Sequence, residues 1–143
     1  MTSFQIQDAD FERRVRENFA LQHVMQLIGA SLSRVEPGAV DITLPYRKDL
    51  TQQHGYIHAG ILTTVADSAC GYAAYTLMPD GSEVLSVEFK VNLLRPAAGE
   101  RFVAEARVLK AGKTLMVTRC DVYGQVADEA KLVATMLATM IRR

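Results

Sequence analysis

The sequence lacks several features that would assign it to particular protein classes. Its 143 residues carry 16 basic and 16 acidic side chains, so the formal net charge is zero, which argues against a nucleic-acid-binding surface. The two cysteines, Cys70 and Cys120, lie in apolar segments, where free buried thiols are commoner than a disulfide. Asp67 interrupts the longest apolar run, and the next, residues 132–141, is too short to span a bilayer as a helix. We therefore expect a soluble protein that binds neither nucleic acid nor membrane.

The N-terminus and the composition predict a single cytoplasmic domain. Residues 1–8 contain no basic stretch followed by an apolar one, so we expect no signal peptide. With 49% hydrophobic and 22% charged residues, the chain suits one globular domain over residues 1–143. Its zero net charge and slightly positive mean hydropathy indicate that some apolar surface is covered by oligomerisation.

The most informative stretch is a polar loop, residues 52–60, that leads into an apolar segment, residues 61–77. Apolar residues recur in that segment at helical spacing, at Leu62, Val65, Ala66, Ala69, Cys70 and Ala73. Asp67 is its one carboxylate, and small residues share the helix face with it, namely Gly60, Thr63, Thr64 and Gly71. No Lys or Arg lies between residue 52 and the end of the segment, and an uncompensated carboxylate in an apolar helix indicates function. The alternative is that Asp67 lies on the solvent-facing stripe of an ordinary amphipathic helix.

The flanking segments predict the rest of the architecture. Residues 10–29 have the pattern of an amphipathic helix, and two strands, residues 30–35 and 39–45, meet at a Pro-Gly turn. Four further segments read as strands, namely 85–93, 101–110, 114–123 and 129–141. The first alternates apolar residues with Ser86, Glu88, Lys90 and Asn92, while the last is apolar on both faces and its Val and Thr residues favour strand over helix. This order predicts an antiparallel sheet with one helix packed on its face.

Three motifs together resemble the hotdog-fold acyl-CoA thioesterases of the phenylacetate-degradation (PaaI-like) and 4-hydroxybenzoyl-CoA types. They are Gln52–Asp67, Ser86–Pro96 and Leu109–Leu115, and the resemblance covers nearly the whole chain from Ala20 onward. It implies an α+β hotdog fold, in which a six-stranded antiparallel sheet wraps around a central helix, with an N-terminal helix added. It also implies an acyl-CoA substrate, no cofactor, and a homodimer paired edge to edge within a homotetramer.

The resemblance assigns catalytic roles to four residues. Asp67 matches the acid on the central helix that acts as nucleophile or general base, and Gln52 matches an amide fifteen residues before that acid. His58 matches the second His of the motif, and the backbone N–H of Ala59 matches the group that polarises the thioester carbonyl. The sequence departs from the usual His-Gly-Gly by placing Ala59 before Gly60. Because the role needs only an N–H, alanine can serve it.

Substrate-binding residues are predicted from the same comparison and from the chemistry of CoA. Gly60 at the helix N-terminus is expected to contact substrate. Gly71 replaces a Ser or Thr often found one turn after the acid, and the small helix face there, with Tyr72 or Tyr75, is expected to line the acyl pocket. The CoA phosphates require cations, for which the candidates are Arg95, Lys113, Lys110, Arg47 and Lys48.

Helix geometry predicts that the site is shared between subunits. Asp67 lies eight residues after Ala59, which is about 12 Å along a helix, too far for both groups to act on one carbonyl within a chain. We therefore expect a dimer whose site combines the Gln52-His58-Ala59 end of one subunit with Asp67 of another.

The sequence is less typical of a metalloenzyme or a serine hydrolase. A metal site at His54, His58 and Asp67 is disfavoured because the loop is not a rigid helical face, and no other ligand set is evident. A serine hydrolase lacks its Gly-x-Ser-x-Gly motif. A non-catalytic acyl-CoA-binding hotdog protein, or a hotdog hydratase or dehydratase, stays open because a fold does not determine function.

Overall fold

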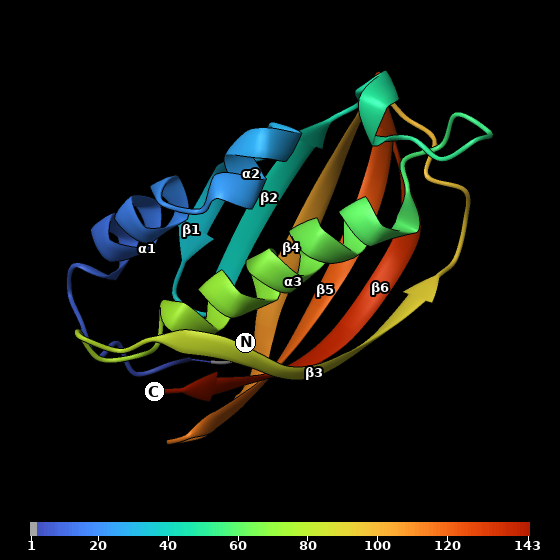
Figure 1. Ribbon diagram of the computed structural model, residues 1–143. Coiled ribbons are helices and arrows are strands. Elements are labelled where there is room, and N and C mark those ends of the chain that lie inside the picture. Colours follow the sequence, from blue (N-terminus) through green and yellow to red (C-terminus); the bar gives the residue numbers. More distant parts are fainter. Residues whose placement is uncertain (1–2) are drawn as a thin grey trace.

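The computed structural model describes residues 3–143, and a six-stranded antiparallel sheet curves around one long helix (Figure 1). The strands are β1 Ser31–Glu36, β2 Ala39–Pro45, β3 Val84–Leu93, β4 Arg101–Ala111, β5 Leu115–Val126 and β6 Glu129–Arg142. They pair in the order β1-β2-β4-β5-β6-β3. The helices are α1 Phe11–Ala20, α2 His23–Ile28 and α3 Ala59–Tyr75, with a short 3-10 turn, η1, at Lys48–Leu50. The predicted sheet and central helix are confirmed.

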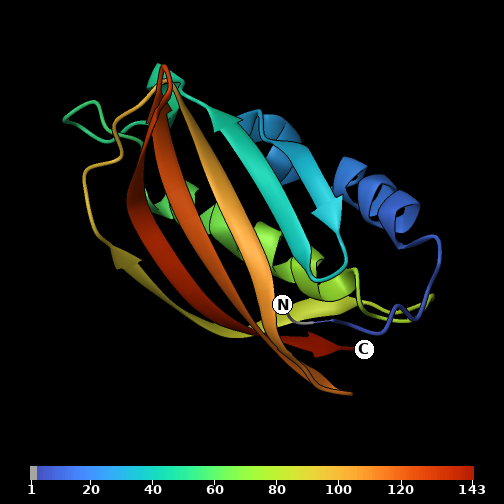
Figure 2. The same ribbon diagram turned by 180° about the vertical axis from the view of Figure 1, so that it is seen from behind.

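Helix α3 forms the core because one side of it is both apolar and small. Ala66, Ala69 and Ala73 are almost fully buried, and short side chains let the backbone of the sheet approach the helix closely. Seen from behind, the strands cover α3 (Figure 2). The thiols of Cys70 and Cys120 are free and buried in this core, as expected. A hydrogen bond with Cys70 and burial raise the pKa of Cys120 well above its usual value.

The last segment of the chain is a strand, as its Val and Thr residues predict. In β6 the side chains of Met136, Ala138 and Met140 are buried, while Leu137 is about half exposed. No helix among residues 3–143 is long and apolar enough to cross a membrane.

The N-terminal region differs from the single helix predicted over residues 10–29. It forms two helices, α1 and α2, which lie beside β1 (Figure 1). The N–H groups of Leu21 and Gln22 donate to the carbonyls of Asn18 and Phe19, three residues earlier, which tightens and ends α1. The backbone of Gln22 is extended, and its side chain turns towards α3. Hydrophobic spacing gave no sign of this break, which lies within a continuous amphipathic pattern.

Strand β3 is an edge of the sheet and contains a bulge. Its register with β6 shifts between Ser86 and Glu88, with Val87 as the extra residue. Strict alternation would place Ser86 and Glu88 on the same face of the sheet. In the structure Ser86 lies opposite the buried Met140, whereas Glu88 lies opposite Thr139. The bulge therefore puts the two side chains on different faces. Since a bulge re-aims the side chains of a strand, Ser86 faces α3.

Candidate active site

Asp67 lies in the middle of α3 on the side that borders β3. Its Oδ1 accepts a hydrogen bond of 2.6 Å from Ser86 Oγ, and within residues 3–143 it forms no ion pair. The carboxylate is partly exposed and lines a hollow of about 250 Å³. Asp67 is therefore held by a hydroxyl and is open to a ligand. The alternating pattern of residues 85–93 did not predict that Ser86 would reach Asp67, because the orientation of Ser86 depends on the bulge.

The far wall of this hollow is a hydrogen-bonded group of polar side chains. Gln22 Nε2 donates to the Tyr72 hydroxyl at 3.0 Å, and that hydroxyl donates to Asn18 Oδ1 at 3.0 Å. Ser68 Oγ donates to Gln22 Oε1 at 3.1 Å. Burial raises the pKa of Tyr72, so its hydroxyl keeps its proton. Tyr72 was a predicted pocket residue, whereas Asn18, Gln22 and Ser68 were not, because they read as the polar face of an ordinary helix.

A second hollow, of about 470 Å³, lies at the N-terminal end of α3. It brings together three predicted residues, Gln52, Ala59 and Arg95. The rest of its lining is mostly apolar, namely Tyr56, Ile57, Leu62, Leu93, Leu94, Pro96 and Ala97.

His58 caps the start of α3 and thereby determines which N–H groups are free. Its Nδ1 accepts a hydrogen bond of 2.8 Å from the Gly60 N–H, and its carbonyl accepts one of 2.9 Å from the Ile61 N–H. The Ala59 N–H finds no acceptor within residues 3–143. The first N–H groups of a helix point outward from its positive end, so the Ala59 N–H is a free donor on a residue that lines the second hollow. Catalytic roles for the His58 imidazole and the Ala59 N–H stay predictions.

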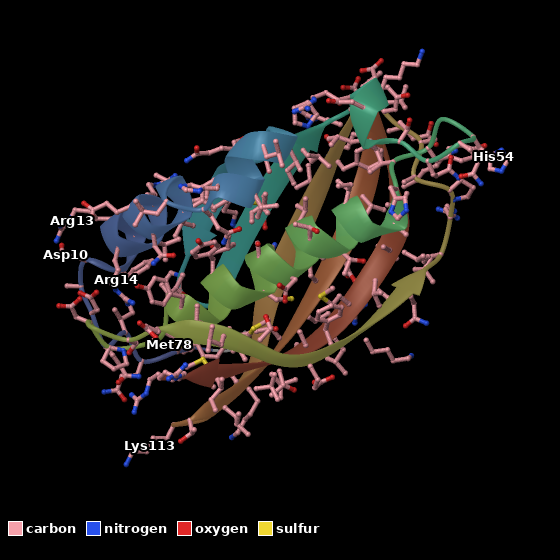
Figure 3. All side chains as sticks on the ribbon, in the orientation of Figure 1. Asp10, Arg13, Arg14, His54, Met78 and Lys113 are labelled. Atoms are coloured by element: carbon pink, nitrogen blue, oxygen red, sulfur yellow. The ribbon has the colours of Figure 1, made fainter. Side chains whose placement is uncertain are left out.

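Gln52 shapes the loop before the helix. Its Oε1 accepts hydrogen bonds from the backbone N–H groups of His54, at 2.5 Å, and Tyr56, at 3.3 Å. This arrangement leaves the Nε2 amide group of Gln52 as a free donor, on a side chain that lines the second hollow. His54 itself lies at the outer tip of the loop (Figure 3). In the part of the chain that the structure describes, no group of three His, Cys, Asp or Glu side chains is placed to hold a metal ion.

The two hollows share no lining residue, and they lie at opposite ends of β3. The hollow of Asp67 is bordered by Val84, Leu85 and Ser86 at the start of the strand, and that of Ala59 by Leu93 at its end. Within one chain, the carboxylate and the helix N-terminus therefore face different cavities, as their spacing along α3 predicts.

Of the remaining residues predicted to contact substrate, some line a hollow and others do not. Gly71 lines the hollow of Asp67, and a Cβ built there meets no atom within 4 Å. Lys113 lines neither of the two hollows and lies at the end of the molecule opposite His54 (Figure 3). Arg47 forms an ion pair with Asp49 at 2.6 Å, and Tyr75 packs under the Arg14 guanidinium, 4.3 Å from its ring centroid. A contact of Lys113 with substrate stays a prediction.

Known proteins share both the sequence pattern and the fold. The thioesterase superfamily model matches residues 54–130, which is more than half of the chain. A thioesterase family protein from Silicibacter pomeroyi has 49% identity and a TM-score of 0.91, with 92% of this chain and 97% of that chain covered. Human acyl-coenzyme A thioesterase 13 is 30% identical over 105 residues, 73% of each chain. The E. coli PaaI protein, at 21% identity, has the same fold, with a TM-score of 0.84 over 97% of this chain and 96% of that one.

The sheet wrapped around α3 and these matches define a hotdog-fold protein of the thioester hydrolase class. The chain belongs to the thioesterase superfamily.

Proposed function

We propose that this protein hydrolyses acyl-CoA thioesters to a free acid and CoA, at sites that each join two subunits. The observation that carries the proposal is the separation of Asp67 and the Ala59 N–H into two hollows at opposite ends of β3. The human relative named acyl-coenzyme A thioesterase 13 supports CoA esters as the substrate class. Arg95 in the second hollow supplies a cation suited to a CoA phosphate.

Strand β3 supports a dimer built on its free edge. It pairs with β6 on one side only, and several of its large apolar side chains are about half exposed, namely Leu85, Val87, Phe89 and Leu93. A long apolar edge is a template for pairing with another strand. In a two-fold antiparallel pair of β3 strands, the start of each strand lies beside the end of the other. The Asp67 hollow of one subunit then meets the Ala59 hollow of its partner.

In that combined site the groups have complementary chemical roles. The Ala59 N–H and the Gln52 amide donate to the carbonyl oxygen, where negative charge develops. Asp67, held by Ser86, either removes a proton from water or attacks the carbonyl carbon itself. In both routes the carbon–sulfur bond breaks and the thiolate of CoA takes up a proton. After direct attack the acyl group is left on Asp67 as a mixed anhydride. Water cleaves this anhydride at the acyl carbon, so in either route the oxygen of water ends in the free acid and the carboxylate of Asp67 is restored.

The same proposal includes two finer features that the family resemblance implies, namely a PaaI-like substrate type and pairing of two dimers into a homotetramer. It also includes the cytoplasmic location expected from the sequence. The likeness to the E. coli PaaI protein concerns the fold alone.

The test is a thiol-release assay with the parent protein and Asp67→Asn on a panel of aryl- and alkyl-acyl-CoA esters. We expect rapid release by the parent and a loss of at least about a hundredfold in the variant, the scale of a removed general base. Equal rates would contradict the role of Asp67. A folded parent that releases no thiol would favour an acyl-CoA-binding protein if it binds the esters tightly, or a hydratase if it adds water to an enoyl-CoA.

A further inference from the structure

Tyr46 connects the sheet to the tip of the loop that precedes α3. Its backbone N–H donates to the carbonyl of Glu100 at 2.9 Å, which continues the pairing of β2 with β4 one step beyond Pro45. Its hydroxyl donates to the carbonyl of Gly55 at 3.2 Å. In the part of the chain that the structure describes, this phenol is the one side chain from outside the loop that hydrogen-bonds to its tip, residues 53–56.

One peptide unit, between Gly55 and Tyr56, joins this phenol to Gln52. The C=O of the unit accepts from Tyr46, and its N–H donates to Gln52 Oε1 at 3.3 Å. Because the C=O and N–H of a planar trans peptide point in opposite directions, the unit lies between the two side chains. Gly55 has a φ of 85°, a left-handed conformation that glycine adopts without strain. Tyr46 and Gln52 therefore hold the two sides of the same peptide unit.

The same contacts determine which end of the Gln52 amide faces substrate. Its Oε1 also accepts from the His54 N–H at 2.5 Å. An amide nitrogen cannot accept hydrogen bonds, so the oxygen faces the loop and Nε2 is the donor available to a thioester carbonyl in the second hollow. Hydrogen bonds in a chain polarise one another. A donor at the Gly55 carbonyl therefore strengthens each later bond, including the one that Nε2 donates.

On the basis of the proposed hydrolysis, in which the Gln52 amide donates to the carbonyl oxygen, we propose that Tyr46 is a positioning residue for that amide. The Tyr46 hydroxyl donates to the peptide C=O, the peptide N–H donates to Gln52 Oε1, and Nε2 donates to the oxygen where charge develops. Tyr46 lines neither hollow, so its effect falls on turnover and not on substrate binding. No proton is transferred along this chain of hydrogen bonds.

Kinetics of Tyr46→Phe, Gln52→Ala and the double variant test this role in the thiol-release assay. We expect Tyr46→Phe to lower kcat about three- to tenfold, the effect of one neutral hydrogen bond, with KM unchanged. In the Gln52→Ala background the chain of hydrogen bonds is already cut, so the same substitution should change kcat by less than about twofold. A general structural role of Tyr46 would instead lower kcat by the same factor in both backgrounds.

The control is Tyr123→Phe, the same substitution on the outer face of β5, and it should keep the kcat and KM of the parent. Tyr46 is exposed, so Tyr46→Phe leaves no cavity and should fold.

Three results would overturn this inference and leave hydrolysis by Asp67 intact. They are a parent-like kcat in Tyr46→Phe, an effect confined to KM, and an equal loss of kcat in both backgrounds. A parent-like kcat in Gln52→Ala would remove Gln52 from the mechanism and overturn the inference with it. A parent that hydrolyses no ester would overturn both the inference and the proposed function.

Discussion

Ser86 donates a hydrogen bond of 2.6 Å to the carboxylate of Asp67, and this contact joins the edge strand β3 to the middle of α3. Nineteen residues separate the two in the chain, and the bulge at Val87 is what brings them together. The hydroxyl fixes one carboxylate oxygen and leaves the other free for a proton or a carbonyl carbon.

Ser86→Ala should therefore lower turnover without unfolding the protein. A hydrogen bond to a charged group contributes about 1.5–3 kcal/mol, so we expect kcat to fall by roughly tenfold or more. Ser86 is exposed on an edge strand, and removing its hydroxyl leaves no cavity in the core. Steady-state kinetics of Ser86→Ala and of the control Ser82→Ala, in the turn before β3, measure the effect. An unchanged kcat in Ser86→Ala would show that Asp67 does not depend on this contact.

Ala59→Pro should remove the proposed carbonyl donor while keeping the helix. Proline is favoured at the first position of a helix, and His58, with φ −60° and ψ 137°, already has the extended backbone that precedes proline. Loss of one such donor lowers kcat by about a hundred- to a thousandfold. Ala59→Gly, which keeps the N–H, should retain activity. Full activity in a folded Ala59→Pro would exclude this N–H from the reaction.

Asp8 anchors the N-terminal segment in a pH-dependent way. Its carboxylate accepts from the Asp10 N–H at 2.9 Å and from Arg14 Nε at 2.7 Å, and these contacts, in that order, hold the pKa of Asp8 below its usual value of 3.8. A lowered pKa means that the charged form stabilises the fold at higher pH. This contribution is lost as the pH falls below 3.8 towards the folded-state pKa.

Thermal unfolding between about pH 7 and pH 3 tests this anchor. We expect Asp8→Asn to have a lower Tm than the parent at neutral pH, with the difference shrinking in acid. Asp10→Asn, which removes an exposed ion pair with Arg13, should change Tm little at any pH because exposed pairs contribute little. A constant difference between Asp8→Asn and the parent across this range would contradict the linkage.

Most of the fold was predictable because its signals are local. The helical spacing of small apolar residues in α3 and the alternation in the strands predicted the architecture. Asp67 stood out as a catalytic candidate because it is the one carboxylate in that helix. The orientation of Ser86 was not predictable, since a bulge arises from pairing with a distant strand. Gln22 was also missed, because its turn into the hollow depends on Tyr72 fifty residues away.

The most direct test of the shared site is a mixed dimer of two inactive variants, Asp67→Asn and Ala59→Pro, carrying different affinity tags. If each site joins Asp67 of one subunit with Ala59 of the other, a mixed dimer has one site with both defects and one intact site. It should then recover about half of the parent activity per dimer. If both groups act within one chain, every site carries a defect and the mixed dimer stays inactive, which would contradict the account.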